Sequence, residues 1–193
     1  KQTAARFVDE APIGTRIGVI SFSGSSKIES DMTERRDELR NAILDIGIGG
    51  IGGTDLYEAV LTSSNLLKNE DNKAVVLLSD GQINVGNLDD AIDYANYHSV
   101  IVHTIGIGTI EGGNTPYGIS KLDEDSLKSL AYNTEGEYFH SLDAENLSRT
   151  FANLYSYTTK KVAIPLFDYL IIFALALLIL EFFLANTKFV NLP

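Results

Sequence analysis

Three apolar runs along the chain have the pattern of buried β-strands. They are rich in β-branched residues and bounded by turn-forming residues, which is typical of strands covered on both faces of a parallel sheet. Two further segments, 27–31 and 137–140, fit a short edge strand and a last strand. The apolar runs are Arg16–Phe22, Ala74–Leu78 and Val100–Ile105.

Between these runs, apolar residues recur at helical spacing. The regular alternation of strands and helices predicts an α/β fold with a doubly wound, mostly parallel sheet and right-handed crossovers. The first ten residues also have the pattern of an amphipathic helix, without an initiator Met or a signal peptide before it. The other predicted helices cover residues 34–44, 55–67, 89–97, 124–132 and 144–155.

The segment Ile164–Leu184 differs from these helices because it has no polar face. Only Asp168 and Glu181 are charged among its 21 residues, and a helix of about 20 apolar residues spans a bilayer core. The two acids lie 13 positions apart, about 20 Å along a helix, so each can lie near a membrane interface. We therefore predict a transmembrane helix. The alternative, a buried core helix, would leave no polar side for water.

The predicted membrane helix makes the chain a cell-membrane protein that crosses the bilayer at least once. Basic residues near the span favour a cytoplasmic domain, since Arg149, Lys160 and Lys161 precede it and Lys188 alone follows it. Four residues do not determine the side of the membrane, which stays open. The predicted parts are a domain at 1–158, a juxtamembrane linker at 159–163, the transmembrane helix at 164–185 and a short tail at 186–193.

The amino-acid composition excludes some kinds of binding partner and metal site. The chain has 193 residues, 45% of them hydrophobic, enough for one α/β domain with a core and an appendage. Its net charge of -11 argues against a nucleic-acid surface, which needs a basic stripe, and favours divalent cations as partners. The absence of cysteine from the sequence excludes disulfides, thiolate metal sites and cysteine nucleophiles.

Two oxygen-bearing side chains are candidates for a metal site. In open α/β sheets, ligands bind outside the carboxyl ends of the strands. Asp80 follows the most apolar strand, and Thr54 follows a glycine-rich stretch at the start of a predicted helix. A hydroxyl and a carboxylate are hard ligands suited to Mg²⁺ or Ca²⁺. The alternatives are a helix cap for Thr54 or Asp55 and a turn residue for Asp80.

Several motifs occur in the order and approximate spacing of a von Willebrand factor A (vWA) domain, which the chain resembles from Lys1 to about Thr158. The last span, with Glu181 and the tail, is similar to the C-terminal anchor of the Bat (aerotolerance) branch of membrane-bound prokaryotic members. The motifs are Arg16–Ser23, Gly52–Leu56, Val76–Gly81 with Asn84 and Gly86, and Val102–Gly108.

The resemblance implies a metal-ion-dependent adhesion site (MIDAS). In this family the site uses an Asp-x-Ser-x-Ser motif, a Thr and an Asp, and an acidic residue of a protein partner completes the coordination. The Thr role falls on Thr54 and the Asp role on Asp80. The first motif should end a strand before the first helix. We therefore expect this chain to lack its N-terminal part with the first central strand, and to bind no Mg²⁺, Ca²⁺ or Mn²⁺ at an incomplete site.

The implied function is a membrane-anchored, divalent-metal-dependent protein-binding module of the adhesion type, and a subunit of a membrane complex. Its partners would be a protein offering an acidic residue to the metal, membrane lipid around the C-terminal helix, other vWA membrane proteins and a MoxR-type AAA+ ATPase. The alternative is a metal-independent structural subunit of a membrane assembly. The loop Gly106–Ser120 is either a partner-recognition loop or a solvated insertion.

Other motifs do not support an enzyme. Gly47–Gly52 matches G-x-G-x-x-G, but a helix is predicted before it where a dinucleotide fingerprint needs a strand. Ser21–Ser25 has the serine spacing of the adhesion motif without its leading Asp, which fits a strand end and a turn. The three histidines are scattered, and no G-x-S-x-G elbow is present in the sequence. We expect no catalytic activity.

Overall fold

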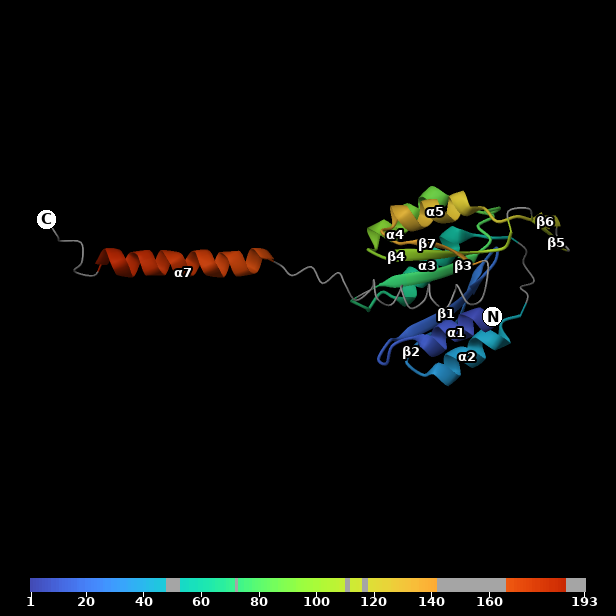
Figure 1. Ribbon diagram of the computed structural model, residues 1–193, viewed down its shortest axis with the longest axis horizontal. Coiled ribbons are helices and arrows are strands. Elements are labelled where there is room, and N and C mark those ends of the chain that lie inside the picture. The colour runs from blue at the N-terminus through green and yellow to red at the C-terminus, as the bar shows by residue number, and fades with distance from the viewer. Residues whose placement is uncertain (48–52, 72, 110–111, 116–117, 142–165, 187–193) are drawn as a thin grey trace. The chain divides into compact units, whose positions relative to one another are not determined.

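The computed structural model describes residues 1–47, 53–71, 73–109, 112–115, 118–141 and 166–186 (Figure 1). The chain separates into two compact units, Lys1–Thr158 and Thr159–Pro193. In the first unit, helices and strands alternate: α1 (Gln2–Glu10), β1 (Ile17–Phe22), β2 (Ser26–Thr33), α2 (Arg36–Asp45), α3 (Leu56–Leu66), β3 (Ala74–Ser79), α4 (Leu88–Tyr97), β4 (Ile101–Ile107), β5 (Gly113–Thr115), β6 (Gly118–Ser120), α5 (Glu124–Asn133) and β7 (Tyr138–Ser141).

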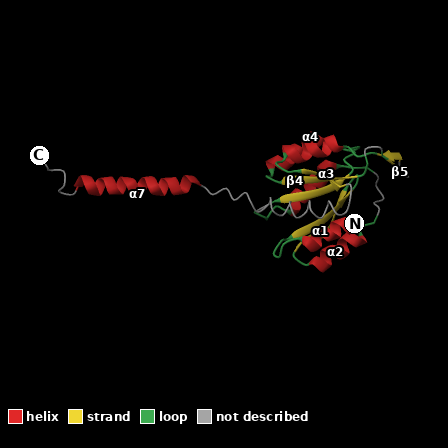
Figure 2. Ribbon diagram, in the orientation of Figure 1, coloured by secondary structure: helices red, strands yellow, loops and turns green. Residues whose placement is uncertain are grey.

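A parallel sheet of three strands, in the order β3-β4-β7, lies at the centre of the first unit. Alternate side chains serve opposite faces, as expected of strands covered on both sides. Leu77 and Val102 pack with the helices α3, α4 and α5, whereas Val76 and Ile105 pack with Phe7 of α1. Helices flank the strands on both sides (Figure 2). The predicted α/β fold with a parallel sheet and covering helices is confirmed.

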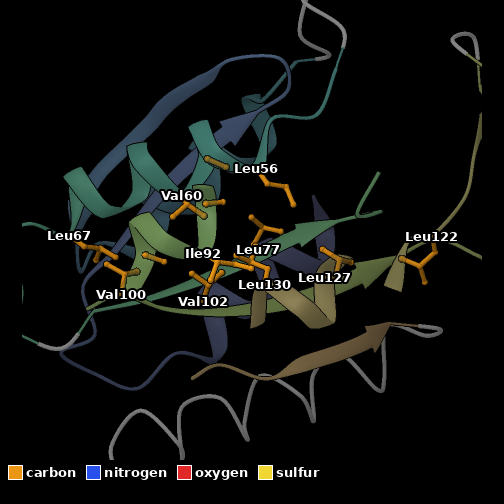
Figure 3. Packing of buried hydrophobic residues seen from close by; sticks show 13 residues of the cluster. Leu56, Val60, Leu67, Leu77, Ile92, Val100, Val102, Leu122, Leu127 and Leu130 are labelled. Atoms are coloured by element: carbon orange, nitrogen blue, oxygen red, sulfur yellow. The ribbon is translucent and has the colours of Figure 1, made fainter. Parts of the chain in front are cut away.

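The larger core lies between this sheet and the helices α3, α4 and α5, whose apolar side chains point toward the strands (Figure 3). Val60, Leu127 and Leu130 are fully buried there. The buried hydroxyl of Thr104 donates a hydrogen bond to the carbonyl oxygen of Leu127, 2.9 Å away, which satisfies a polar group that would otherwise weaken the core. Strand β4 is therefore held to α5 by packing and by hydrogen bonding.

Strands β1 and β2 form a separate antiparallel hairpin. Val19 of β1 packs with Leu39 and Ile43 of α2 and with α1, so a second, smaller core lies under the hairpin. Helix α3 contacts both the hairpin and, through the larger core, the parallel sheet. Within the described residues, β1 and β3 are not paired with each other. The strands thus form two sheet segments that share one helix.

The segment 106–120 is more structured than a loop. After β4 it contains the short hairpin β5–β6, paired from Gly113 to Ser120. The prediction of an uninterrupted loop was wrong because each strand has three residues, too few for a period-two pattern to stand out. The predicted helix 144–155 lies outside the described residues.

The second unit contains the helix α7 (Leu166–Asn186). Side chains are described for residues 170–171 and 173–182 of this helix, and large apolar ones among them, such as Phe173 and Leu178, are exposed. Over the described residues, no helix of the structure is long and apolar enough to cross a membrane.

The buried position of Leu130 gives a stability prediction. Leu130→Ala should lower the free energy of unfolding by about 2–5 kcal/mol, because the side chain leaves a cavity between α5 and β4. Urea denaturation of the full chain in neutral detergent, followed by circular dichroism, measures the change. The control is Leu44→Ala on α2, where the side chain is 44% exposed and the cost should stay near about 0.5 kcal/mol. Equal losses in both variants would contradict the assignment of this core.

Candidate functional site

The carboxyl ends of the three parallel strands meet at one edge of the sheet. Ser79 of β3 is in register with Gly106 of β4, and Gly106 is in register with His140 of β7. The chain segments that leave these strands therefore start side by side. Ligands of open α/β sheets bind outside this edge, so the candidate site consists of the segments that lie there.

Asp80 lies directly after β3, in a tight turn with two side-chain acceptors. Its Oδ1 accepts a hydrogen bond from the backbone N–H of Gln82 at 3.2 Å, and the hydroxyl of Ser79 accepts one from Gly81 at 3.0 Å. The backbone N–H of Asp123 donates to the carbonyl oxygen of Asp80 at 2.7 Å. The turn containing Asp80 is therefore fixed to the segment that precedes α5.

Gly81 makes this close approach possible. Its φ of +77° lies in the left-handed region that favours glycine, and a Cβ at this position would be 2.3 Å from the carbonyl oxygen of Asp123. Any side chain would push the turn away from α5. The Ser79-Asp80-Gly81 sequence thus requires its glycine for both conformation and space.

Thr54 is brought to the same edge by its backbone. Its N–H donates to Oδ1 of Asn84 at 2.6 Å. Its carbonyl oxygen accepts long bonds, 3.4 Å each, from the backbone N–H groups of Asn84 and Val85. The segment before α3 is therefore tied to the segment that follows Asp80. The structure thus brings the two predicted ligands, Thr54 and Asp80, to neighbouring segments of one edge.

Asp55 caps helix α3, and this leaves the hydroxyl of Thr54 for another role. Oδ1 of Asp55 accepts a hydrogen bond from the backbone N–H of Glu58 at 3.1 Å. Among the described residues, the Thr54 hydroxyl has no hydrogen bond in the structure. Of the two alternatives for the cap, Asp55 is correct, and the cap interpretation of Thr54 was wrong.

Residues that the sequence interpretation did not assign to the site hold it together. Asn84 and Gly86 are part of the motif that resembles the vWA family. The side chain of Asn84 accepts a hydrogen bond from the backbone N–H of Thr54 and so fixes its position. Gly86 has a φ of +79°, and a Cβ there would be 2.9 Å from Oδ1 of Asp55. Asp123 caps α5 by accepting a hydrogen bond from the N–H of Ser126. In the sequence, only its position before a predicted helix indicates a structural role.

The donor chemistry of Thr54 and Asp80 fits a hard divalent cation. Mg²⁺ is commonly held by one or two carboxylates while it keeps several waters. Within the described part of the chain, no group of three or more His, Asp or Glu side chains is placed to hold a metal ion. These two residues can therefore form part of a magnesium site, and further donors are needed to complete it.

The two motifs set aside in the sequence have ordinary structural roles. Ser21 donates its hydroxyl hydrogen bond to Glu29 across the hairpin at 2.7 Å, and the N–H of Ser23 donates to Ser25 in the turn that joins β1 to β2. The glycine-rich stretch follows helix α2, which ends at Asp45, so it is not the strand-to-helix turn of a dinucleotide site. Residues 48–52 lie outside the described residues.

The titratable groups on β4, α5 and β7 serve packing and charge pairing. Burial lowers the pKa of His103 to about 4, so the ring is neutral and its Nδ1 accepts a hydrogen bond from the N–H of Glu137 at 3.1 Å. The hydrogen bond from Lys128 lowers the pKa of Glu124, and burial raises the pKa of Tyr138 to about 12. Glu124 is ion-paired with Lys128 and lies 3.8 Å from Nε2 of His140.

Residues 1–153 match the family model described as von Willebrand factor type A domain. A curated relative, the UPF0353 protein of Mycobacterium sp. (strain KMS), is 26% identical over 178 residues. That alignment covers 80% of this chain and 51% of the relative, so the chain spans about half the length of the curated relatives it matches.

Several solved structures share the fold. An aerotolerance-related membrane protein from Bacteroides fragilis has a TM-score of 0.72 at 16% identity, over 80% of this chain and 85% of that one. BatB from Bacteroides thetaiotaomicron has a TM-score of 0.72 at 19% identity, over 83% and 86%. Proximal thread matrix protein 1 from the mussel byssus, with a zinc-occupied MIDAS motif, has a TM-score of 0.61 at 20% identity, over 80% and 38%.

The close approach at Gly81 gives a prediction with a matched control. Gly81→Ala should lower the free energy of unfolding by more than about 2 kcal/mol, because a positive φ costs about 1 kcal/mol and displacing the Asp123 backbone adds to it. The control is Gly14→Ala, since Gly14 has a similar φ of +86° with nothing within 4 Å of its Cβ position. Denaturant titration of both variants separates the two contributions, and equal losses would show that the contact with Asp123 is unimportant.

Proposed function

The chain belongs to the von Willebrand factor type A family, and from this membership we propose that it is a membrane-anchored, divalent-metal-dependent protein-binding module. The observation that carries the proposal is the hydrogen bonding of Thr54 to the segment after β3. It holds a hydroxyl near the turn of Asp80 at the ligand-binding edge of the sheet. The zinc-occupied MIDAS of the mussel protein, a structural neighbour, supports the type of site.

In this proposal Thr54 and Asp80 hold the cation and the surrounding backbone positions them. When bound, Mg²⁺ supplies an open coordination position for a carboxylate of the protein partner. Asn84 fixes the peptide of Thr54 through the 2.6 Å hydrogen bond. The turn bonds to Gln82 and Asp123 restrict Asp80. Such restriction lowers the entropy lost when the partner binds.

The remaining donors are assigned to an Asp-x-Ser-x-Ser motif at the end of one further strand. Strands β1 and β3 are unpaired with each other in the described residues, although the hairpin and the parallel sheet share helix α3. A strand between them would join both segments into one sheet. Its carboxyl end would then lie beside Asp80, where the missing ligands are required.

Removal of the Asp80 carboxylate tests the metal role. In a protein that joins this chain to a strand ending in an Asp-x-Ser-x-Ser motif, Asp80→Ala should weaken Mg²⁺ binding by at least about ten-fold, since ligand-shell changes commonly cost that much. Isothermal titration calorimetry measures the affinity. The control Asp45→Ala removes an exposed carboxylate at the end of α2 and should leave Mg²⁺ binding unchanged. Equal affinity of the Asp80 variant and the unmodified protein would refute the metal role.

A second candidate function is a metal-independent structural subunit of a membrane assembly. The observation that favours it is the small number of metal-ligating side chains at the site. Among the described residues, no group of three or more acids or histidines is placed to hold a metal. The two functions differ in their response to a chelator. A metal-dependent complex should dissociate in EDTA, whereas a structural subunit should co-purify with its partners unchanged.

The membrane anchor is proposed from the sequence of residues 164–185. This segment is apolar except for Asp168 and Glu181, and the described side chains of α7 expose large hydrophobic groups such as Phe173 and Leu178. The Bacteroides fragilis neighbour is described as a membrane protein, which is compatible with this proposal. Companion vWA membrane proteins and a MoxR-type AAA+ ATPase are the proposed members of the complex.

Charged substitutions in α7 test the anchor. Leu175→Arg combined with Leu178→Arg should shift the full chain out of the lipid fraction in a sucrose flotation assay with liposomes. Each arginine at mid-bilayer depth opposes insertion by about 2.5–3.5 kcal/mol. The control Leu44→Arg places one arginine on α2, at an exposed position outside the proposed span, and should still float. Flotation of the double variant with the liposomes would contradict the anchor.

A further inference from the structure

A shallow cleft of about 570 Å³ lies against the helices α3 and α4. It is lined by Tyr57, Asp90, Asp93, Tyr94 and Tyr97, which we call the aromatic–acidic cleft. Four of these residues belong to α4 at spacings of three, four and seven positions, so they form one stripe of the helix surface. Tyr57 of α3 forms the facing wall.

The aromatic rings of this cleft contact one another. The rings of Tyr57 and Tyr94 meet edge to face, with centroids 5.8 Å apart and an interplanar angle of 79°. The ring of His98 lies 4.4 Å from Tyr94 and 5.1 Å from Tyr97. Tyr97 is nevertheless 85% exposed. The cleft therefore presents aromatic surface to solvent beside an ordered cluster of rings.

Core packing explains only part of this aromatic surface, because Tyr57 and Tyr94 are half-buried and pack against the larger core, whereas Tyr97 is exposed. The buried residues of α4 are Ala91, Ile92 and Ala95, which lie on the face toward the sheet. A tyrosine with most of its ring in water adds little to stability there, whereas tyrosine is enriched at binding surfaces because one rigid ring gives a large contact area. The exposed aromatic surface is therefore better explained by contact with another molecule.

The charge around the rings is uniformly negative. Helices α3 and α4 together contain Glu58, Asp89, Asp90 and Asp93 and have no lysine or arginine in their sequences. Among the described residues, none of these four carboxylates takes part in an ion pair. The four carboxylates therefore remain available for a cation from another molecule.

We propose that the aromatic–acidic cleft binds an arginine or lysine side chain presented by a protein partner. A cation over a tyrosine face gains a cation–π interaction, and the carboxylates of Asp90 and Asp93 can accept charge-assisted hydrogen bonds from the same group. An anionic ligand would be repelled. An apolar ligand would desolvate the two carboxylates without compensation.

The cleft is shallow, so a side chain on the surface of a protein partner fits it better than a free small molecule does. Small-molecule sites enclose most of the ligand surface, whereas Tyr97 and both aspartates are exposed here. This contact would be independent of the metal, because the cleft residues are different from Thr54 and Asp80. It therefore adds a second recognition surface to the proposed protein-binding function.

A labelled arginine peptide tests the proposal. The probe is a fluorescent Gly-Arg-Gly-Arg-Gly peptide, and the matched neutral peptide carries citrulline in place of arginine. Fluorescence anisotropy with the full chain, in uncharged detergent and with EDTA present, measures binding without the metal. Tyr97→Ala and Asp93→Asn should each weaken arginine-peptide binding roughly three- to five-fold, as expected for one cation–π or charge contact.

Two control variants separate the cleft from the general negative charge of the protein. Tyr132→Ala removes an exposed tyrosine of α5, and Asp125→Asn removes an exposed carboxylate of the same helix. Both should leave the affinity within about two-fold of the unmodified chain, since neither lines the cleft. Equal weakening by cleft and control variants, equal binding of the citrulline peptide, or no binding of the arginine peptide would each overturn the proposal. Because EDTA is present throughout, failure of the metal-site proposal would not affect this result.

Discussion

The arrangement of the domain depends on the hydrogen bonds of Thr54 and Asp55, which connect the hairpin, α3 and the segment after β3. The N–H of Asp55 donates to the carbonyl oxygen of Ser23 at 2.8 Å, which connects the end of β1 to the start of α3. The Asp55 side chain begins the helix, and its backbone bridges to Val85. Asp55 is buried, and a buried carboxylate is costly unless it is hydrogen bonded. The hairpin, α3 and the segment after β3 are thus held together by two residues, and the same segment bonds Thr54 through Asn84 and Val85.

The sequence was sufficient for the main strands and helices of the first unit, although it missed the short hairpin β5–β6. Buried parallel strands leave long apolar runs, and amphipathic helices leave periodic ones, so β3, β4 and the helices between them could be located. Asp80 was recognisable because a polar residue ends the most apolar run. The separation into two sheet segments was less accessible, because strand pairing joins residues far apart in the chain. The hydrogen bond from Thr54 to Asn84 was hidden for the same reason.

The two recognition surfaces argued for this domain have opposite chemistry. At the sheet edge, a cation held by Thr54 and Asp80 would attract a partner carboxylate. On the flank of α3 and α4, tyrosines and aspartates would attract a partner cation. A partner with both kinds of group on one face would be recognised by charge pattern as well as by shape, which improves discrimination more than affinity. The chain is strongly acidic, with a net charge of -11. It therefore attracts partners that approach with a basic surface.

The sides of β1 and β3 that face no paired strand in the described residues have a consequence for how the domain folds. Each presents a row of backbone donors and acceptors, and such rows are templates for pairing with an extended polypeptide. The strand proposed to carry the remaining metal donors would pair with both rows. Closing the two edges and assembling the metal site would then be one folding event.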